Sequence, residues 1–176
     1  MFREEFKQNK KLKIQVITLS DRASRAEYQD LSGPEIVKQL TDYFTEKDWV
    51  FNVALEVIPD DAELLENKLI EYRDSKIDFV FTTGGTGIGP RDFTPEVAKK
   101  LIEKEIPGIM ENIRVKYGQL VPNALLSRGV AGVLQQTQLY CLPGSLKAVK
   151  EYMTEILKTL EHLIFMLYGV DVHQKH

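Results

Sequence analysis

A glycine- and threonine-rich segment joins an apolar run to a helical pattern, and few folds accommodate such a junction. Residues 82–96 read TTGGTGIGPRDFTPE, after the apolar run Ile77–Phe81 and before a helical pattern that begins at Thr94. Glycine lacks a Cβ, so its backbone N–H groups can approach an anion closely, and the N-terminus of a following helix adds a positive dipole. The segment therefore predicts a buried strand, a phosphate-binding loop and a helix in succession.

The glycines match neither of the two common nucleotide-binding fingerprints. No Gly-Lys-Ser/Thr triplet follows them, as a P-loop requires, and a G-x-G-x-x-G pattern that starts at Gly85 meets Pro90 at its last position. Gly84 and Gly85 could instead be ordinary turn residues. Six Thr and Gly residues with a Pro-Arg-Asp sequence shortly after them are more than a plain turn needs, which favours anion binding.

Five segments have the hydrophobic pattern of β-strands. They are residues 13–19, 50–58, 77–83, 130–134 and 138–142. Too few residues separate the last two segments for a crossover helix, so these two strands should pair antiparallel. The short basic cluster from Lys7 to Lys13 is interpreted as a solvated lead-in to the first strand.

Helical spacing fills the intervals between the strands. Ser32 is expected to cap one helix, with Pro34 early in it and Glu35 three residues after the cap. The other helices are expected after residues 59–61, from Thr94 until Pro107-Gly108 breaks the pattern, over residues 109–117, and after residues 143–145. The last of these is long and amphipathic.

The alternation of strands and helices predicts an α/β fold. We expect a mainly parallel β-sheet with helices on both faces and a short antiparallel element. Residues 1–176 would form a single domain, with a core over about residues 11–169 and polar termini. Ligands of such sheets bind beyond the carboxyl ends of the strands. The polar loops expected there are residues 20–22, 59–61, the glycine-rich segment and residues 142–145, the last only if its strand runs parallel to the others.

Composition narrows the function classes. With 43% apolar and 28% charged residues, the chain has the composition of a globular protein large enough to need no disulfide. Its one cysteine, Cys141, lies in an apolar run and is expected to be a buried thiol. A net charge of −3 argues against non-specific nucleic-acid binding. No signal peptide or membrane-spanning run is seen, so a cytoplasmic protein without membrane contact is expected. The three histidines form no ligand pattern.

Two aspartates at neighbouring strand ends are candidate metal ligands. Asp60 could simply cap the helix that follows it, with Glu63 three residues on, and Asp92 could be a surface carboxylate. Beside an anion-binding loop, the two together would make a reasonable Mg²⁺ site, because Mg²⁺ is held by a few carboxylates, waters and substrate phosphates. The sequence leaves both interpretations open.

Other polar residues near the strand ends are equally open. Arg22, Arg91 and Arg128 could bind phosphate or could be solvated. Ser127 could donate a hydrogen bond to a phosphate or could only form a turn.

Several short motifs occur in the order and spacing found in molybdopterin adenylyltransferases. They are Ser20-Asp21-Arg22-Ala23-Ser24, Ile58-Pro59-Asp60, the segment 82–95, Ile106-Pro107-Gly108, Leu126-Ser127-Arg128 and Leu142-Pro143-Gly144. Over about residues 11–169 the chain resembles the Mog type of this family, which is related to the G domain of gephyrin. The glycine-rich segment is shared with MoaB-like and MoeA-like proteins, whereas Pro59-Asp60 and Arg91-Asp92 are similar to the adenylylating branch.

The resemblance implies a reaction and a set of site residues. AMP would pass from ATP to the terminal phosphate of molybdopterin with release of pyrophosphate, in a homotrimer that supplies a MoeA-like molybdenum-insertion protein. Asp60 and Asp92 would be the catalytic residues and Mg²⁺ ligands. The substrate- and nucleotide-binding residues would be Ser20, Asp21, Gly84, Gly85, Thr86, Gly87, Arg91, Ser127, Arg128, Pro143, Gly144 and Ser145. The contacts of the variable loop at residues 28–33 are not implied.

The chemistry is consistent with that implication. The acceptor is a phosphate monoester with a second pKa of about 6, so it is mostly ionised near neutrality and needs no general base. Asp60 and Asp92 are therefore assigned to metal and nucleotide positioning, not to proton abstraction. The alternatives are a non-catalytic, MoaB-like molybdopterin-binding protein and an unrelated nucleotide phosphotransferase.

Overall fold

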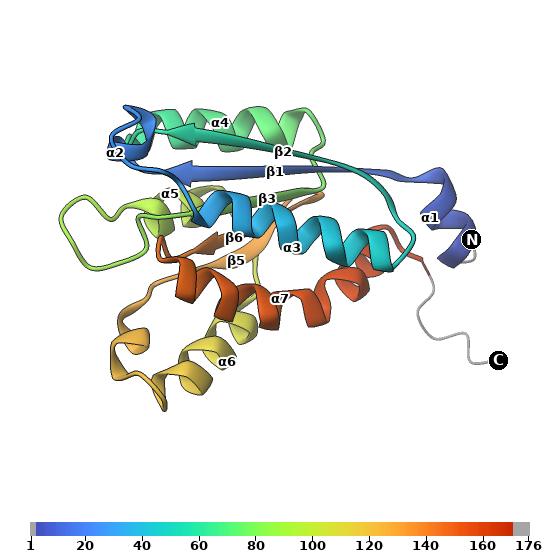
Figure 1. The fold of residues 1–176 in the computed structure, drawn as a ribbon. Coiled ribbons are helices and arrows are strands. Elements are labelled where there is room, and N and C mark those ends of the chain that lie inside the picture. The colour runs from blue at the N-terminus through green and yellow to red at the C-terminus, as the bar shows by residue number, and fades with distance from the viewer. Residues whose placement is uncertain (1–2, 171–176) are drawn as a thin grey trace.

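The computed structural model describes residues 3–170 and contains a six-stranded sheet (Figure 1). Its strand order is β2-β1-β3-β6-β5-β4. The strands are β1 (Lys11–Leu19), β2 (Val50–Ile58), β3 (Phe79–Thr83), β4 (Lys104–Glu105), β5 (Ala131–Leu134) and β6 (Thr137–Leu142). The pairs β1–β2, β1–β3 and β3–β6 are parallel, whereas β5–β6 and β4–β5 are antiparallel. This confirms the predicted mainly parallel sheet with a short antiparallel element.

Helices cover both faces of the sheet, as predicted (Figure 1). They are α1 (Arg3–Asn9), α2 (Asp21–Ser24), α3 (Ser32–Glu46), α4 (Ala62–Asp74), α5 (Thr94–Leu101), α6 (Pro107–Gly118) and α7 (Leu146–Leu167), with the 3₁₀ helix η1 (Pro122–Leu126) after α6. One core cluster joins the sheet to α1, α3, α6 and α7, and a second joins it to α4 and α5. The structure thus has three layers, with the sheet in the middle.

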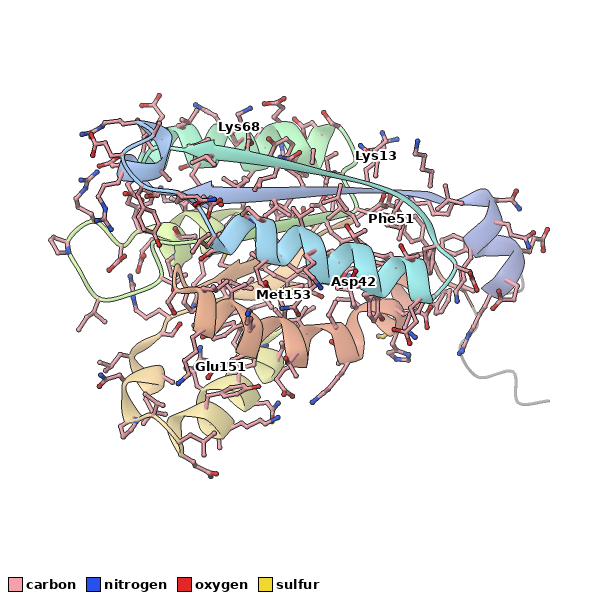
Figure 2. The ribbon with its side chains drawn as sticks, in the orientation of Figure 1. Lys13, Asp42, Phe51, Lys68, Glu151 and Met153 are labelled. Carbon is pink, nitrogen blue, oxygen red and sulfur yellow. The ribbon has the colours of Figure 1, made fainter. Side chains whose placement is uncertain are left out.

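Burial on both faces explains the apolar strands in the middle of the sheet. All residues of β3 and β6 are buried, because helices lie above and below these strands. The edge strand β2 alternates instead between exposed and partly covered residues over most of its length. Figure 2 shows the side chains between the layers; Met153 on α7 is fully buried, whereas the carboxylate of Asp42 on α3 faces solvent.

The predicted solvated lead-in at residues 7–13 is correct only in part, because Gln8, Asn9, Lys11 and Lys13 are exposed but Leu12 is buried. Residues 3–9 form α1, and Phe6 packs edge-on against Trp49 and Phe165, with ring centroids 6.0 and 6.2 Å apart. Lys10 forms a 2.7 Å ion pair with Asp78, whose side chain is only 3% exposed. The segment is therefore part of the core packing, although its charges conceal this in the sequence.

One predicted helix cap and one helix end are corrected, and one of the two interpretations of Asp60 is excluded. Asp30, not Ser32, caps α3, since its Oδ1 accepts the N–H groups of Ser32 and Gly33 at 3.0 and 3.1 Å. Asp61, not Asp60, caps α4, because its Oδ1 accepts the N–H of Leu64 at 2.9 Å. The proline–glycine pair at residues 107–108 starts α6 and does not end α5, which stops at residue 101.

The remaining expectations concern isolated residues and segments. Cys141 is fully buried, and burial raises its pKa to about 12, as expected of a structural thiol. His162 lies on α7, while His173 and His176 fall outside the described residues. Between residues 3 and 170, no helix is both long enough and apolar enough to cross a bilayer.

Candidate functional site

Four loops meet at one edge of the sheet. The strands β1, β2, β3 and β6 run in the same direction and end at matching positions, with Leu19 opposite Ile58, Thr18 opposite Thr83, and Thr83 opposite Leu142. The loops that follow them, at residues 20–24, 59–61, 84–93 and 143–145, therefore begin side by side. The predicted convergence is confirmed, and β6 brings the fourth loop into it.

The first two glycines of the glycine loop (residues 84–93) allow it to pass close to its neighbours. Gly84 and Gly85 have φ values of +110° and +66°, which favour glycine over any L-residue with a side chain. A Cβ on Gly84 would lie 2.5 Å from the carbonyl oxygen of Leu19, and one on Gly85 would lie 2.4 Å from Oγ1 of Thr94. Oγ1 of Thr94 in turn donates to the carbonyl oxygen of Gly84 at 3.0 Å. These contacts fix the start of the loop.

The later glycines make room for the carboxylate of Asp92. A Cβ on Gly87 or Gly89 would lie 2.7 or 2.9 Å from Oδ2 of Asp92. The N–H of Gly89 donates to this oxygen at 2.8 Å, and the N–H of Asp92 donates to the carbonyl oxygen of Gly89 at 3.0 Å. The loop therefore curls around one oxygen of Asp92 and holds the carboxylate in place.

Arg128 braces the glycine loop from the segment that follows η1. Its Nε donates to the carbonyl oxygen of Gly87 and its Nη2 to that of Asp92, each at 2.7 Å. Its Nη1 pairs with the carboxylate of Glu96, and its backbone N–H donates to the carbonyl oxygen of Thr86 at 2.9 Å. The guanidinium is thus bonded to the loop itself, and a direct phosphate contact by Arg128 stays a prediction.

Asp21 and Asp60 bind each other's backbone across the first two loops. The N–H of Asp21 donates to Oδ2 of Asp60 at 3.1 Å, and the N–H of Asp60 donates to Oδ1 of Asp21 at 3.0 Å. Oδ2 of Asp21 also pairs with the guanidinium of Arg91 on the glycine loop. The hydrogen bond from the N–H of Asp60 and then the one from Arg91 lower the pKa of Asp21.

Two hollows lie on either side of the glycine loop. The polar hollow, of about 500 Å³, is lined by Leu19, Ser20, Asp21, Arg22, Arg25, Asp60, Gly85, Arg91 and Asp92. The glycine-loop hollow, of about 440 Å³, is lined by Gly84, Gly85, Thr86, Gly87, Ile88, Asp92, Asn123, Leu126, Ser127, Pro143, Gly144 and Ser145. Because Gly85 and Asp92 line both, the two hollows adjoin at these residues.

The serines among the predicted site residues partly serve the local backbone. Oγ of Ser20 accepts the N–H of Ala23 at 3.2 Å and caps α2, and Oγ of Ser145 accepts the N–H of Ala148 at 3.3 Å and caps α7. Gly144 is tied to α3, since its carbonyl oxygen accepts the hydroxyl of Ser32 at 2.8 Å. Each residue still lines a hollow, so its local role fixes where the loop presents it.

The donor set of the polar hollow suits a hard divalent cation that is completed by substrate oxygens. Asp21, Asp60 and Asp92 provide carboxylates, although residues 3–170 contain no group of three Asp, Glu, His or Cys side chains arranged to enclose a metal. Mg²⁺ is commonly held by one or two carboxylates, with waters and phosphate oxygens filling its other positions. The hollow therefore fits Mg²⁺ bound together with a phosphate ligand.

Comparison with known proteins assigns this geometry to a family. A family model described as a probable molybdopterin binding domain matches residues 15–162. The chain belongs to that family. The match runs from β1 into α7, so the matched region includes all four loops of the site.

Individual relatives and a solved structure support the same family assignment. A molybdopterin adenylyltransferase of Helicobacter pylori strain J99 is 35% identical over 166 residues, which cover 93% of each chain. The gephyrin of Dictyostelium discoideum is 34% identical over 170 residues, which cover 94% of this chain and 24% of gephyrin. A solved structure of the molybdopterin biosynthesis enzyme MoaB from Thermus thermophilus is 35% identical, covers 90% of this chain and 97% of its own, and gives a TM-score of 0.79. The family resemblance and the fold class are thus confirmed.

Among the polar residues that line the two hollows, sequence reasoning missed Arg25 and Asn123. Arg25 follows the short helix α2, while Asn123 and Leu126 belong to η1. A single 3₁₀ turn has no hydrophobic period, so periodicity does not distinguish residues 122–126 from an ordinary loop. The proline at position 122, which starts η1, is the one local signal.

Proposed function

We propose that this chain is a molybdopterin adenylyltransferase, which transfers AMP from ATP to the terminal phosphate of molybdopterin. The observation that carries the proposal is the pair of adjoining hollows that share Gly85 and Asp92. One hollow is rich in charge and suits a triphosphate. The other is lined by loop backbone and small polar side chains, and suits the phosphate of a second, organic substrate.

The polar hollow provides both signs of charge that a metal-bound triphosphate needs. Arg22, Arg25 and Arg91 line it and can pair with phosphate oxygens. Asp60 and Asp92 would hold Mg²⁺, and the metal ion would neutralise part of the negative charge of the ATP phosphates. Arg91 already pairs with Asp21, so a bound phosphate would compete with a carboxylate for this guanidinium.

The glycine-loop hollow would bind the acceptor. Backbone N–H groups of residues 85–87 and the hydroxyls of Ser127 and Ser145 are the donors proposed for a phosphate there, since the N–H of Gly84 donates to the carbonyl oxygen of Leu142. An oxygen of the acceptor phosphate attacks the α-phosphorus of ATP, a new P–O bond forms, and the bond to the β-phosphate oxygen breaks as pyrophosphate leaves. Since the attacking oxygen is already ionised, the side chains position and screen the two phosphates and remove no proton.

The wider setting of the reaction follows the family resemblance. We propose that the protein works in the cytoplasm as a homotrimer and passes the adenylylated pterin to a MoeA-like molybdenum-insertion protein. Exposed apolar side chains over α6 and η1 support self-association, because so dense a group is uncommon on a monomer surface. They are Val115, Leu120, Val121, Leu125 and Leu126. The homotrimer can be tested by light scattering coupled to size-exclusion chromatography, which measures the mass of the assembly.

A non-catalytic molybdopterin-binding role is the second candidate. It is favoured by one observation: Asp92 is bonded to the N–H of Gly89, so its carboxylate has a structural task whether or not it binds metal. In that case, the protein would bind molybdopterin tightly and ATP hardly at all.

The test is a reconstituted assay. The purified protein is incubated with molybdopterin, ATP and Mg²⁺, and adenylylated pterin and pyrophosphate are quantified by chromatography with mass detection. We expect both products in equal amounts, with none when EDTA replaces Mg²⁺. Pterin binding without either product would refute the enzyme and support the binding protein. ATP turnover at a rate that does not depend on the presence of the pterin would instead indicate an unrelated nucleotide phosphotransferase.

A further inference from the structure

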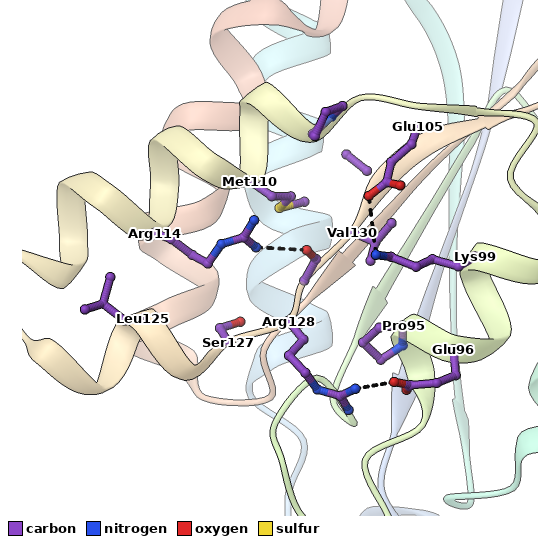
Figure 3. Close-up of a pocket in the computed structure, with 13 residues that line it drawn as sticks. Pro95, Glu96, Lys99, Glu105, Met110, Arg114, Leu125, Ser127, Arg128 and Val130 are labelled. Carbon is purple, nitrogen blue, oxygen red and sulfur yellow. Dashed lines mark hydrogen bonds and ion pairs between the residues drawn. The ribbon is translucent and has the colours of Figure 1, made fainter.

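Ser127 occupies a position where several cavities meet. It lines the glycine-loop hollow, a largely apolar hollow of about 260 Å³ between α6, η1 and α7, and the hollow of about 360 Å³ drawn in Figure 3. Ser127 therefore borders the space that a ligand in the glycine-loop hollow would occupy. The orientation of that hydroxyl decides whether it offers a proton or a lone pair to the ligand.

A buried tyrosine hydroxyl sets that orientation. Tyr152 on α7 is 4% exposed, and its OH donates to Oγ of Ser127 at 2.7 Å. A serine hydroxyl carries one proton and two lone pairs. With one lone pair occupied by Tyr152, the proton and the remaining lone pair of Ser127 are left for a ligand. Burial also raises the pKa of Tyr152, so the tyrosine stays protonated and remains the donor.

The tyrosine ring is confined on the side of the chain that follows Ser127. A Cβ on Gly129 would lie 3.1 Å from Cε1 of Tyr152 and 2.7 Å from the carbonyl oxygen of Cys141, so glycine at this position leaves space for the ring. The carbonyl oxygen of Gly129 accepts Nη1 of Arg114 at 3.3 Å, as Figure 3 shows. The ring therefore has little room for movement on this side.

Arg128 fixes the same segment on its other side. Its backbone N–H and its guanidinium are bonded to the glycine loop, and its Nη1 pairs with Glu96, also seen in Figure 3. Residues 127–129 are thus held by α7, by α6 and by the glycine loop. A hydroxyl on so rigid a segment is preorganised, which is worth most where charge must be met without rearrangement.

We infer that Tyr152 is a positioning residue that orients the hydroxyl of Ser127 to donate to a phosphate oxygen bound in the glycine-loop hollow. The inference rests on the proposed function for the identity of that phosphate. The phosphate belongs either to molybdopterin or to ATP, and the two sources share the same chemistry at this hydroxyl. Tyr152 lines the apolar hollow but not the glycine-loop hollow, so it would act on this phosphate through Ser127.

The test compares four proteins in the adenylylation assay. Tyr152→Phe keeps the ring and removes one hydroxyl, and should lower kcat/KM about tenfold, near the upper end for a lost hydrogen bond between neutral groups. Ser127→Ala should lower it at least as much. The double variant should be no worse than Ser127→Ala alone, because both changes remove the same interaction. The substrate whose KM or kcat/KM changes identifies the phosphate that is contacted.

Tyr140→Phe is the matched control. It removes another buried tyrosine hydroxyl, which donates to Oε1 of Gln138 at 3.0 Å within β6, away from the hollows. It should change the thermal stability without changing kcat/KM. A general packing defect would instead affect both variants alike, which separates positioning from simple loss of stability.

Two results would overturn the inference. Tyr152→Phe with wild-type kcat/KM for both substrates is one, and losses that multiply in the double variant are the other. If wild-type protein forms no product, the proposed function fails separately. The affinities of wild type and Tyr152→Phe for molybdopterin and for ATP are then compared by fluorescence titration. About tenfold weaker binding of either ligand supports the inference, and unchanged binding of both refutes it.

Discussion

Replacing Gly87 by alanine would test the geometry of the glycine loop directly. The added Cβ would lie 2.7 Å from Oδ2 of Asp92, whereas ordinary contact begins at 3.4 Å. The carboxylate must therefore retreat by about 0.7 Å and loosen its bond to the N–H of Gly89. Displacements of this size at a reacting centre lower rates by up to about 100-fold. We expect kcat/KM for adenylylation to fall by about 10- to 100-fold.

Stability should change much less than activity. The Gly89 bond is exposed, so its loss should cost about 1 kcal/mol and lower Tm by only a few degrees. Gly108→Ala is the matched control, because no atom lies within 4 Å of its added Cβ and the position is inside α6. That variant should keep wild-type kcat/KM and be equally or slightly more stable.

A double variant shows whether the clash acts through Asp92. In an Asp92→Ala background the new methyl group meets no carboxylate, so Gly87→Ala should lower the residual activity no further. Wild-type kcat/KM in the single Gly87→Ala variant would refute the idea that this glycine exists to accommodate Asp92. So would a fall in Tm large enough to leave the protein unfolded at the assay temperature.

Three further predictions concern carboxylates. Asp92→Asn keeps an oxygen for the N–H of Gly89 but loses the charge, so turnover should fall by more than about 100-fold with an unchanged melting curve; wholesale unfolding would instead assign Asp92 a structural role. Asp78→Asn leaves the ammonium of Lys10 without its buried partner, so urea titration should show a loss of about 3 kcal/mol, and an unchanged midpoint would contradict this. Hydrogen bonds from Lys116 and then Lys158 lower the pKa of Glu155 to about 2 from its ordinary 4.5, so their stabilisation is present above pH 4.5 and is lost as the pH falls toward 2. Tm measured between pH 7 and pH 3 should therefore decline less steeply for Glu155→Gln, and parallel curves would refute the assignment.

The sheet was predictable because burial on both faces leaves a strong pattern. The bounds of β2 match the prediction, and β1, β3, β5 and β6 differ from it by no more than two residues at either end. The direction of β6 was not predictable, since the hairpin with β5 fixes only the relative direction of those two strands. The helix α1 was missed because one residue, Phe6, carries its contact with the core, and its aromatic partners are distant in sequence.

Local sequence could not decide between adjacent residues with the same chemistry. Asp60 and Asp61 both precede α4, and either carboxylate can cap a helix. The structure uses Asp61 for the cap and bonds Asp60 to the N–H of Asp21, a residue 39 positions earlier in the chain. The choice depends on a contact between two loops that only the parallel pairing of β1 and β2 brings together.

Local sequence is equally unable to assign roles within the glycine loop and its neighbours. Some of these residues shape the loop, whereas others face the ligand. Gly84, Gly85 and Gly87 are required because an added Cβ at each position would clash with a neighbouring atom. Arg128 holds the loop by donating hydrogen bonds to the loop's backbone carbonyl oxygens. Residues such as Asp60 and Arg91 instead face the polar hollow. A sequence motif contains both kinds side by side and so cannot separate them. Substitutions can separate them. Changes to the residues that shape the loop should displace it and weaken the binding of both ATP and molybdopterin. Arg91→Ala should weaken ATP binding and leave molybdopterin binding intact.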